Sequence, residues 1–194
     1  MIIGLTGQSG AGKSTVSQFL KESGLFVIDC DKVSRDLNKK GSDLNKKLSD
    51  AFGKDIISEN GELNRALLAK KAFSGKENTE LLNSITHPEI ISAIMGIIEN
   101  SNEQNIVLDA PTLFESGADK LCDKIICVVA NEKTRKERIA ARDNISLEQI
   151  NARLSAQKED SFYINRADAV IHNDSDKKTL KTSTNNALKQ IGVK

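Results

Sequence analysis

The stretch Gly7-Gln8-Ser9-Gly10-Ala11-Gly12-Lys13-Ser14 completes the pattern G-x-x-x-x-G-K-[S/T] and directly follows the apolar residues 1–5. Glycines let the backbone fold tightly enough for several N–H groups to converge on one anion. Lys13 adds a cation for the β- and γ-phosphates of a nucleotide, and the Ser14 hydroxyl is a ligand for Mg²⁺. Residues 15–20 read as a helix whose positive end faces the phosphates. The stretch therefore predicts a phosphate-binding loop for a nucleoside triphosphate, with contacts from Ser9, Gly10, Ala11, Gly12, Lys13, Ser14 and Thr15.

The composition shows no marked charge bias. Among 194 residues, 28 Lys and Arg stand against 27 Asp and Glu, a net charge of +1. This balance gives no reason to expect a nucleic acid or a membrane surface as partner. There is no run of 18 apolar residues and no basic N-terminal region, so we expect neither a membrane span nor a cleavable signal, and a cytoplasmic location.

The cysteines support the same location. Cys30, Cys122 and Cys127 are odd in number and show no C-x-x-C spacing. A disulfide framework or a zinc site is therefore not expected, and a reducing compartment fits best.

Short apolar runs rich in β-branched residues alternate with helical stretches along the chain. They lack the polar–apolar alternation of half-exposed strands, which is typical of strands buried on both faces of a parallel sheet. The sequence thus predicts an α/β protein of three layers, α/β/α, with a five-stranded parallel sheet. The expected strands are residues 2–6, 25–29, 106–110, 124–129 and 169–172.

Three helices carry recognisable end signals. Thr86-His87-Pro88 predicts a helix start with Pro88 as the first helical residue. Ser146-Leu147-Glu148-Gln149 has the pattern of a capping box. A last helix is expected over about 177–191.

The spacing of the strands predicts how the single domain is organised. The gap from residue 31 to residue 105 is too long for one crossover helix, so a helical insertion that caps the substrate is expected over about 32–103. A charge-dense stretch over about 132–149 predicts a small mobile lid. The core then comprises about 1–31, 104–131 and 150–194.

Carboxylates stand where two predicted strands end. Ligands of open parallel sheets bind outside the carboxyl ends of the strands, so acids there face the site. Asp29 and Asp31 end the second strand. One of them, with Asp31 favoured by position, accepts the proton of an acceptor hydroxyl or holds Mg²⁺; the alternative is that either caps the next helix. Asp109 ends the third strand like a Walker-B carboxylate that reaches Mg²⁺, or has a structural role. Glu115 is a weaker candidate.

Arginines gather in the predicted lid. Arg135, Arg138 and Arg142 follow at helical spacings of three and four, on one face. Aimed at a phosphoryl group, they neutralise charge as it shifts towards the leaving oxygen, and lid closure delivers them once substrate is bound. The alternative is a solvated basic face paired with nearby acids. Arg35, Arg65 and Arg153 are individually weaker phosphate contacts, and His87 and His172 indicate little.

Taken in order, these pieces resemble the dephospho-coenzyme A kinase family, in the nucleoside-monophosphate-kinase-like branch of P-loop kinases. The resemblance covers nearly the whole chain, and the Asp-x-Asp strand end, the His-Pro and the tail together are quite specific. Beyond the loop, its motifs are Gly4-Leu5-Thr6-Gly7, Ile28-Asp29-Cys30-Asp31 with Arg35, Gly61-Glu62-Leu63-Asn64-Arg65, His87-Pro88, Pro111-Thr112-Leu113-Phe114-Glu115, Arg138, Arg142-Asp143, Gln157 and Ala167-Asp168-Ala169-Val170-Ile171-His172-Asn173.

The resemblance implies transfer of the γ-phosphate of ATP, with Mg²⁺, to the ribose 3′-hydroxyl of dephospho-CoA. Separately, a monomer or weak homo-oligomer is expected. The resemblance implies that Asp31 is the catalytic base or a positioning group, that Lys13 and Arg142 stabilise the phosphoryl charge, and that Ser14 and Asp109 bind the metal. The implied nucleotide contacts further include Arg138 and, beside the adenine, Asn173. The implied acceptor contacts are Asp31, Arg35, Arg65 and His87.

Some residues depart from the family pattern. The loop reads Gly7-Gln8-Ser9-Gly10-Ala11 where the family more often has Gly-Gly-Ile-Gly-Ser, and Cys30, Thr112 and Ser175 stand where Ala, Leu and Gly are usual. The backbone N–H groups perform the loop's function, so nucleotide binding is expected regardless.

Three other functions compete with the one that the resemblance implies. Another small-molecule kinase of the same architecture, acting on a nucleoside, nucleotide or sugar acid, fits the loop and the lid arginines equally well. A GTP-dependent switch needs a guanine-reading Asn-Lys-x-Asp, and both Asn38-Lys39-Lys40-Gly41 and Asn45-Lys46-Lys47-Leu48 lack the acid. A silent nucleotide-binding module is disfavoured because the candidate catalytic residues are present.

Overall fold

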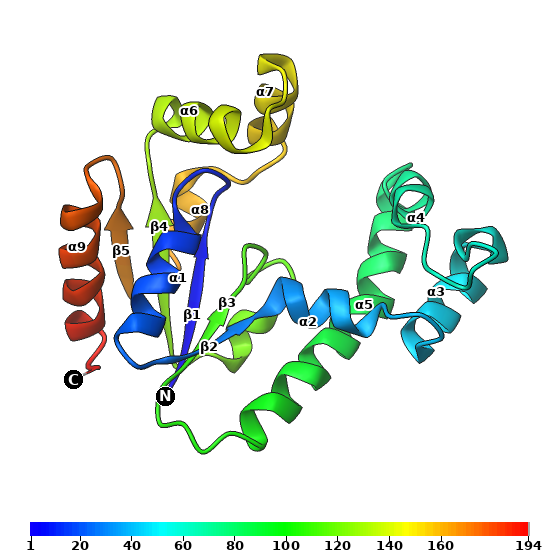
Figure 1. Ribbon diagram of the computed structural model, residues 1–194, viewed down its shortest axis with the longest axis horizontal. Helices are drawn as coiled ribbons and strands as arrows, with labels where there is room; N and C mark the ends of the chain where they lie inside the picture. Colours follow the sequence, from blue (N-terminus) through cyan, green and yellow to red (C-terminus); the bar gives the residue numbers. More distant parts are fainter. Residues whose placement is uncertain (194) are drawn as a thin grey trace. The chain divides into compact units, whose positions relative to one another are not determined.

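A computed structural model describes residues 1–193, and the chain divides into two compact units (Figure 1). We call them the core unit, Met1–Ile28 with residues 103–193, and the insertion unit, Asp29–Asn102. The insertion unit covers nearly the same residues as the predicted helical insertion, 32–103.

The strands and helices follow the expected α/β order. The strands are β1 (Ile2–Gly7), β2 (Phe26–Asp29), β3 (Ile106–Asp109), β4 (Lys124–Val129) and β5 (Ala169–His172). The helices of the core unit are α1 (Lys13–Glu22), α6 (Glu132–Asp143), α7 (Leu147–Ser155), α8 (Asp160–Ile164) and α9 (Lys177–Gln190), with the 3₁₀ turn η2 (Ala118–Leu121). The insertion unit contains α2 (Cys30–Leu37), α3 (Asp43–Phe52), the 3₁₀ turn η1 (Lys54–Ile56), α4 (Arg65–Ala72) and α5 (Lys76–Glu99).

The five strands form one sheet in the order β2-β3-β1-β4-β5. The pairs β1–β3, β1–β4 and β4–β5 are parallel, with Leu5 opposite both Asp109 and Ile126. This arrangement confirms the predicted five-stranded parallel sheet. Because β1 is central, the loop that follows it emerges between the ends of β3 and β4, where parallel α/β sheets bind ligands.

Both faces of the sheet are buried, which explains the uninterrupted apolar runs. Ile126 and Val128 of β4 belong to a core with residues of α1 and α9, whereas Cys127 and Val129 pack with Tyr163 of α8 on the other face. Burial raises the pKa of the Cys127 thiol to about 12, so this cysteine acts as a small apolar residue.

The insertion unit has an apolar core of its own. Its fully or nearly buried residues come from α3, η1 and α4, and Leu82 and Ile85 of α5 pack against them. The helices of this unit therefore stabilise one another through this shared core.

The expected helix start at Pro88 is wrong. Pro88 lies inside α5, which begins at Lys76. A proline inside a helix removes a backbone hydrogen bond and costs about 3 kcal/mol in isolation. Burial of Leu82 and Ile85, both before Pro88, offsets this cost, since tertiary packing of an apolar face supplies most of the stability of a helix.

Helix α5 also bears on the prediction that the chain has no membrane span. By length and composition alone it could cross a membrane, a weak indication that core helices of soluble domains also give. Within the insertion unit it contacts α2, α3 and α4. The absence of a membrane span therefore stays a prediction.

We expect Asp168→Ala to destabilise the core unit. Asp168 accepts hydrogen bonds from Lys124 Nζ (2.9 Å) and the Ile125 N–H (2.8 Å), which joins the starts of β4 and β5. Burial alone raises the pKa of Asp168, but these bonds outweigh it, and the net shift is downward. Because the side chain is partly exposed, solvent screening leaves about 1 kcal/mol of unfolding free energy.

Urea unfolding of both proteins between pH 3 and pH 7 measures this effect. A carboxylate whose pKa is lower in the folded than in the unfolded protein stabilises the fold fully above its unfolded pKa of about 4. The difference in unfolding free energy between wild type and Asp168→Ala should therefore shrink as the pH falls towards the folded pKa. Asp50→Ala, at an exposed position of α3, is the control. A constant difference across this pH range contradicts the prediction.

Candidate nucleotide-binding site

The phosphate loop joins β1 to α1 and has no space for a side chain at two of its glycines. Gly12, which caps α1, has a φ of 96°, and a Cβ there would lie 2.1 Å from Asn173 Nδ2. Gly10 has a φ of 81°, and its Cβ would lie 2.7 Å from the carbonyl oxygen of Arg135 on α6. Both positions therefore require glycine. The loop is enclosed between α6 and the residue that follows β5.

Lys13 forms an ion pair with Asp109, the last residue of β3. The two side chains are only 17% and 13% exposed. Asp109 thus holds the Lys13 ammonium at the carboxyl edge of the sheet, beside the loop. Asp109, which was predicted from the sequence as a metal ligand, therefore contacts the loop lysine.

A pocket of about 380 Å³ opens on the helical side of the loop. Arg138 from α6 and Asn173 after β5, two of the predicted nucleotide contacts, belong to its lining. The lining consists of Gly10, Gly12, Ser14, Thr15, Arg138, Arg142, Asn173, Ser175, Lys177 and Leu180. Lys177 and Leu180 were not predicted from the sequence, although both follow β5 within a few residues of Asn173.

Asn173 connects the pocket wall to the loop. Its side chain is almost fully buried and donates to the Ala11 carbonyl oxygen over 2.7 Å. Arg138 donates to the Gly10 carbonyl oxygen over 3.4 Å and to Asn173 Oδ1 over 3.5 Å. These contacts hold the wall of the pocket against the backbone of the loop.

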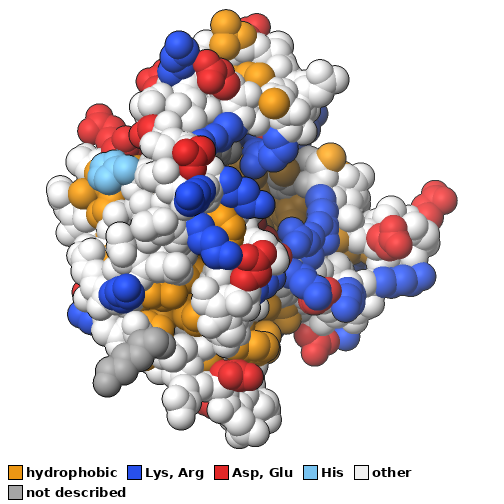
Figure 2. Space-filling model, turned by 60° about the vertical axis from the view of Figure 1, so that its left-hand side comes forward, with side chains coloured by type: hydrophobic (Ala, Val, Ile, Leu, Met, Phe, Trp, Pro, Cys, Tyr) orange, Lys and Arg blue, Asp and Glu red, His pale blue; other side chains and the backbone are white. Residues whose placement is uncertain are grey.

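Arg142 shares a carboxylate with a second arginine. It donates to both oxygens of Asp143 (2.6 and 2.9 Å), and Arg153 of α7 binds the same residue. These hydrogen bonds keep the pKa of Asp143 well below its usual range, so the group stays charged at neutral pH. One carboxylate facing two guanidinium groups leaves a net positive charge at this end of α6. Figure 2 shows both signs of charge side by side over the upper part of the molecule, where α6 and α7 lie.

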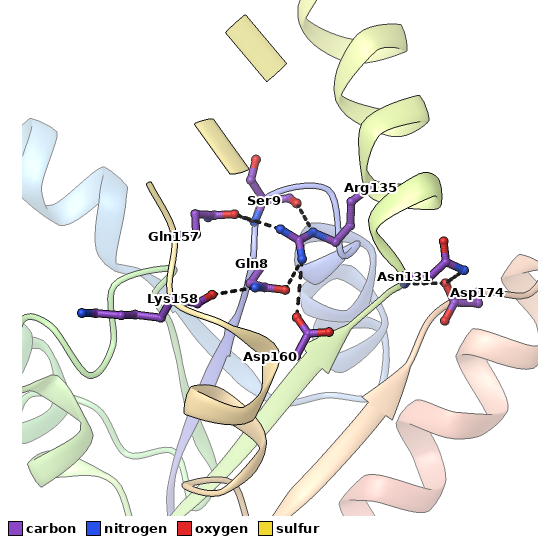
Figure 3. A network of polar contacts seen from close by, with 8 residues as sticks. All are labelled: Gln8, Ser9, Asn131, Arg135, Gln157, Lys158, Asp160 and Asp174. Atoms are coloured by element: carbon purple, nitrogen blue, oxygen red, sulfur yellow. Dashed lines mark hydrogen bonds and ion pairs between the residues drawn. The ribbon is translucent and has the colours of Figure 1, made fainter. Parts of the chain in front are cut away.

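Arg135 differs from the other two arginines of α6. Its guanidinium is buried against the phosphate loop, where it meets Gln8, Ser9, Gln157 and Asp160 (Figure 3). The three arginines that the sequence placed on one helix face therefore reach different surroundings. Asn131 precedes α6 and caps it with its side chain, and its backbone and side chain both donate to Asp174.

The acceptor candidates lie in the insertion unit. Asp29 caps α2, its carboxylate accepting the Lys32 N–H over 2.8 Å, and Arg35 lies 3.7 Å from it. The alternative role of a helix cap thus holds for Asp29, while Asp31 occupies the first turn of α2. Arg65 begins α4, and His87 lies in α5, where burial lowers the pKa of its imidazole.

Glu115 lies near Tyr163 of α8. Burial, and then the charge of Glu115, raises the pKa of this phenol to about 12. Glu115 therefore lies beside an aromatic side chain on the α8 face of the sheet.

Comparison with known proteins places the chain among relatives of one kind. The family model CoaE, dephospho-CoA kinase, matches residues 1–179. A dephospho-CoA kinase of Fusobacterium nucleatum is 39% identical over 180 residues, 93% of each chain. One of Carboxydothermus hydrogenoformans is 41% identical over 175 residues, 89% of this chain and 85% of that protein. The solved dephospho-CoA kinase of Campylobacter jejuni superposes with a TM-score of 0.69 at 27% identity, over 98% of this chain and 96% of that one.

We expect Gly12→Ala to weaken ATP binding on the order of 100-fold, about 2.7 kcal/mol. The added Cβ meets Asn173, which holds the loop. Gly24→Ala is a matched control, because Gly24 has a similar φ of 86° but nothing within 4 Å of the added atom. Calorimetric titration with ATP should show affinity within about twofold of wild type for the control, which carries only the backbone strain. Equal affinities of both variants contradict the assigned role of the Gly12–Asn173 contact.

Proposed function

The chain belongs to the dephospho-CoA kinase family, and we propose that it transfers the γ-phosphate of ATP to the ribose 3′-hydroxyl of dephospho-CoA, giving CoA and ADP. The phosphate loop carries this proposal. Asp109 holds its lysine at the edge of the sheet, and neighbouring residues enclose its glycines. A pocket next to the loop is lined by residues of the kinds that contact nucleotides. Membership of this family identifies dephospho-CoA as the acceptor.

The residues of the loop act on charge rather than through covalent chemistry. Phosphoryl transfer passes through a loose transition state with charge on the equatorial oxygens, so positioning and electrostatic stabilisation dominate. The loop's N–H groups and the positive end of α1 bind the phosphates. Lys13 and Arg142 then stabilise the transferred group, with Arg138 and Asn173 at the rest of the nucleotide.

The residues beside the loop fit Mg²⁺. Ser14 offers a hydroxyl and Asp109 a carboxylate, the hard oxygen ligands that Mg²⁺ prefers. Among residues 1–193 no group of three or more His, Cys, Asp and Glu side chains could hold a metal. A site of one or two protein oxygens completed by phosphates is the usual arrangement for this ion. Bound there, Mg²⁺ would neutralise charge on the β- and γ-phosphates.

Asp31 is the proposed base or positioning group for the acceptor hydroxyl. It follows the end of β2, and acids at strand ends of parallel sheets face the ligand. Arg35, Arg65 and His87 are proposed acceptor contacts of the insertion unit. The predicted lid, 132–149, covers α6 and the turn after it, and we propose that its closure brings Arg142 to the phosphates.

The balanced charge supports an enzyme of small molecules without nucleic acid or membrane as partner. The three cysteines without C-x-x-C spacing support a location in the cytoplasm. We propose a monomer or weak homo-oligomer.

An ADP-release assay with ATP, Mg²⁺ and a panel of acceptors tests this function. Turnover should be confined to dephospho-CoA among dephospho-CoA, AMP, CMP, uridine, adenosine and gluconate. Asp31→Asn should lower kcat about 10²- to 10⁴-fold while ATP binding stays intact, because it removes the proton acceptor.

Asp29→Asn is the control for this substitution, since asparagine caps a helix as well as aspartate does. It should keep near wild-type activity. Turnover with another panel member alone would favour the competing small-molecule kinase, and no turnover despite ATP binding would favour a silent module or a switch.

Arg142→Met should lower kcat on the order of 100-fold, because a charged group aimed at the phosphoryl oxygens is lost. Arg153→Met is the matched control. It removes the other guanidinium on Asp143 but leaves the pocket residue in place. Steady-state kinetics of the two variants should differ by more than tenfold in kcat, and equal kcat values would argue against a role of Arg142 in transfer.

A further inference from the structure

Arg135 is a buried cation in direct contact with the phosphate loop. Only 7% of its side chain is exposed, although it lies in the first half of a helix whose other arginines reach the pocket. Its acceptors are mostly neutral: one carbonyl oxygen and two side-chain amides (Figure 3). Its carboxylate neighbour, Asp160, is 48% exposed and 3.4 Å away, the length of a weak bond. A tight ion pair therefore does not account for this burial.

The contacts of Arg135 close a ring around one residue of the loop. Its Nε donates to the Ser9 carbonyl oxygen over 3.2 Å, and its second terminal nitrogen donates to Gln157 Oε1 over 3.3 Å. Gln157 Oε1 in turn accepts the Ser9 N–H over 3.2 Å. Both backbone polar groups of Ser9 are thus held by two side chains that also bind each other. This fixes the orientation of the loop backbone just before the N–H groups that receive the phosphates.

Gln8 extends the ring to a second loop residue. Its Oε1 accepts from Arg135, and its Nε2 donates to the Lys158 carbonyl oxygen over 2.7 Å. Gln8 is 5% exposed, so both ends of its amide are satisfied in a buried setting. The helix α6 and the segment that follows α7 therefore meet at Gln8 and Ser9.

We propose that Arg135 is a positioning residue for ATP binding: its planar fork fixes the phosphate loop, through the Ser9 backbone and the Gln8 side chain, from the base of the lid. Five donors in a rigid plane can serve carbonyl and amide acceptors at once. A lysine ammonium keeps the charge but cannot reproduce this geometry. The inference rests on the proposed binding of ATP at the loop, and it adds a residue that does not touch the nucleotide.

Calorimetric titration with ATP–Mg²⁺ and steady-state kinetics test the proposal. Arg135→Met should raise the Kd and KM for ATP about tenfold, while kcat at saturating ATP and the KM for dephospho-CoA stay within about threefold. Arg135→Lys should not restore the affinity. Lys133→Met, which removes an exposed cation from the same helix, should leave ATP binding unchanged.

Further measurements separate positioning from a loss of folding. Gln157→Met deletes the other side chain of the ring, and it should also raise the Kd for ATP, by a smaller factor. Amide hydrogen exchange of residues 8–12 should be faster in both variants, in samples whose thermal unfolding shows a folded protein. If wild type binds no ATP, the proposed function fails. If wild type binds ATP and Arg135→Met binds it within twofold, or if Arg135→Lys restores full affinity, only this proposal is overturned.

Discussion

The phosphate loop can bind an anion only if its backbone is free of side chains where the chain turns, and the packing around it depends on this constraint. Asn173 approaches Gly12 and α6 approaches Gly10 within distances that exclude a Cβ. The same closeness brings the Asn173 amide to Ala11 and the Arg135 fork to Ser9. Gly10 and Gly12 are therefore needed for two reasons. Their positive φ angles favour glycine, and Arg135 and Asn173, which hold the loop, occupy the space that a Cβ would need.

The charges around the loop are arranged in two different ways. Lys13 and Arg142 each have a carboxylate partner, Asp109 and Asp143, which orients the charged group. Arg135 is held mainly by neutral acceptors, which orient it without cancelling its charge. Preorganised groups need no reorganisation when charge develops on the transferred phosphoryl. Asp109 and Asp143, which lie outside the loop, offset the repulsion between these cations.

The sequence predicted the sheet because the strands are short, apolar and separated by helical stretches, and both faces of the sheet are buried. It also predicted the capping box at Ser146. It failed at Pro88, since end signals are local whereas the helix there is held by packing of Leu82 and Ile85 against other helices. A local pattern therefore predicts a helix end well when local hydrogen bonds fix that end, as the capping box at Ser146 does.

The arginines of α6 show the same limit within the candidate site. Helical spacing placed all three on one face, but each residue adds a rise of about 1.5 Å along the helix, so arginines three and seven positions apart meet different neighbours along α6. Arg135, in the first half of the helix, contacts the loop; Arg138 reaches the wall of the pocket; and Arg142, in the last turn, contacts Asp143. Only the position of the loop relative to α6 decides these surroundings, and that position follows from the register of β1 against β4. A one-dimensional pattern can therefore nominate the residues of this site, but the sheet decides which of them face the ligand and which hold the loop.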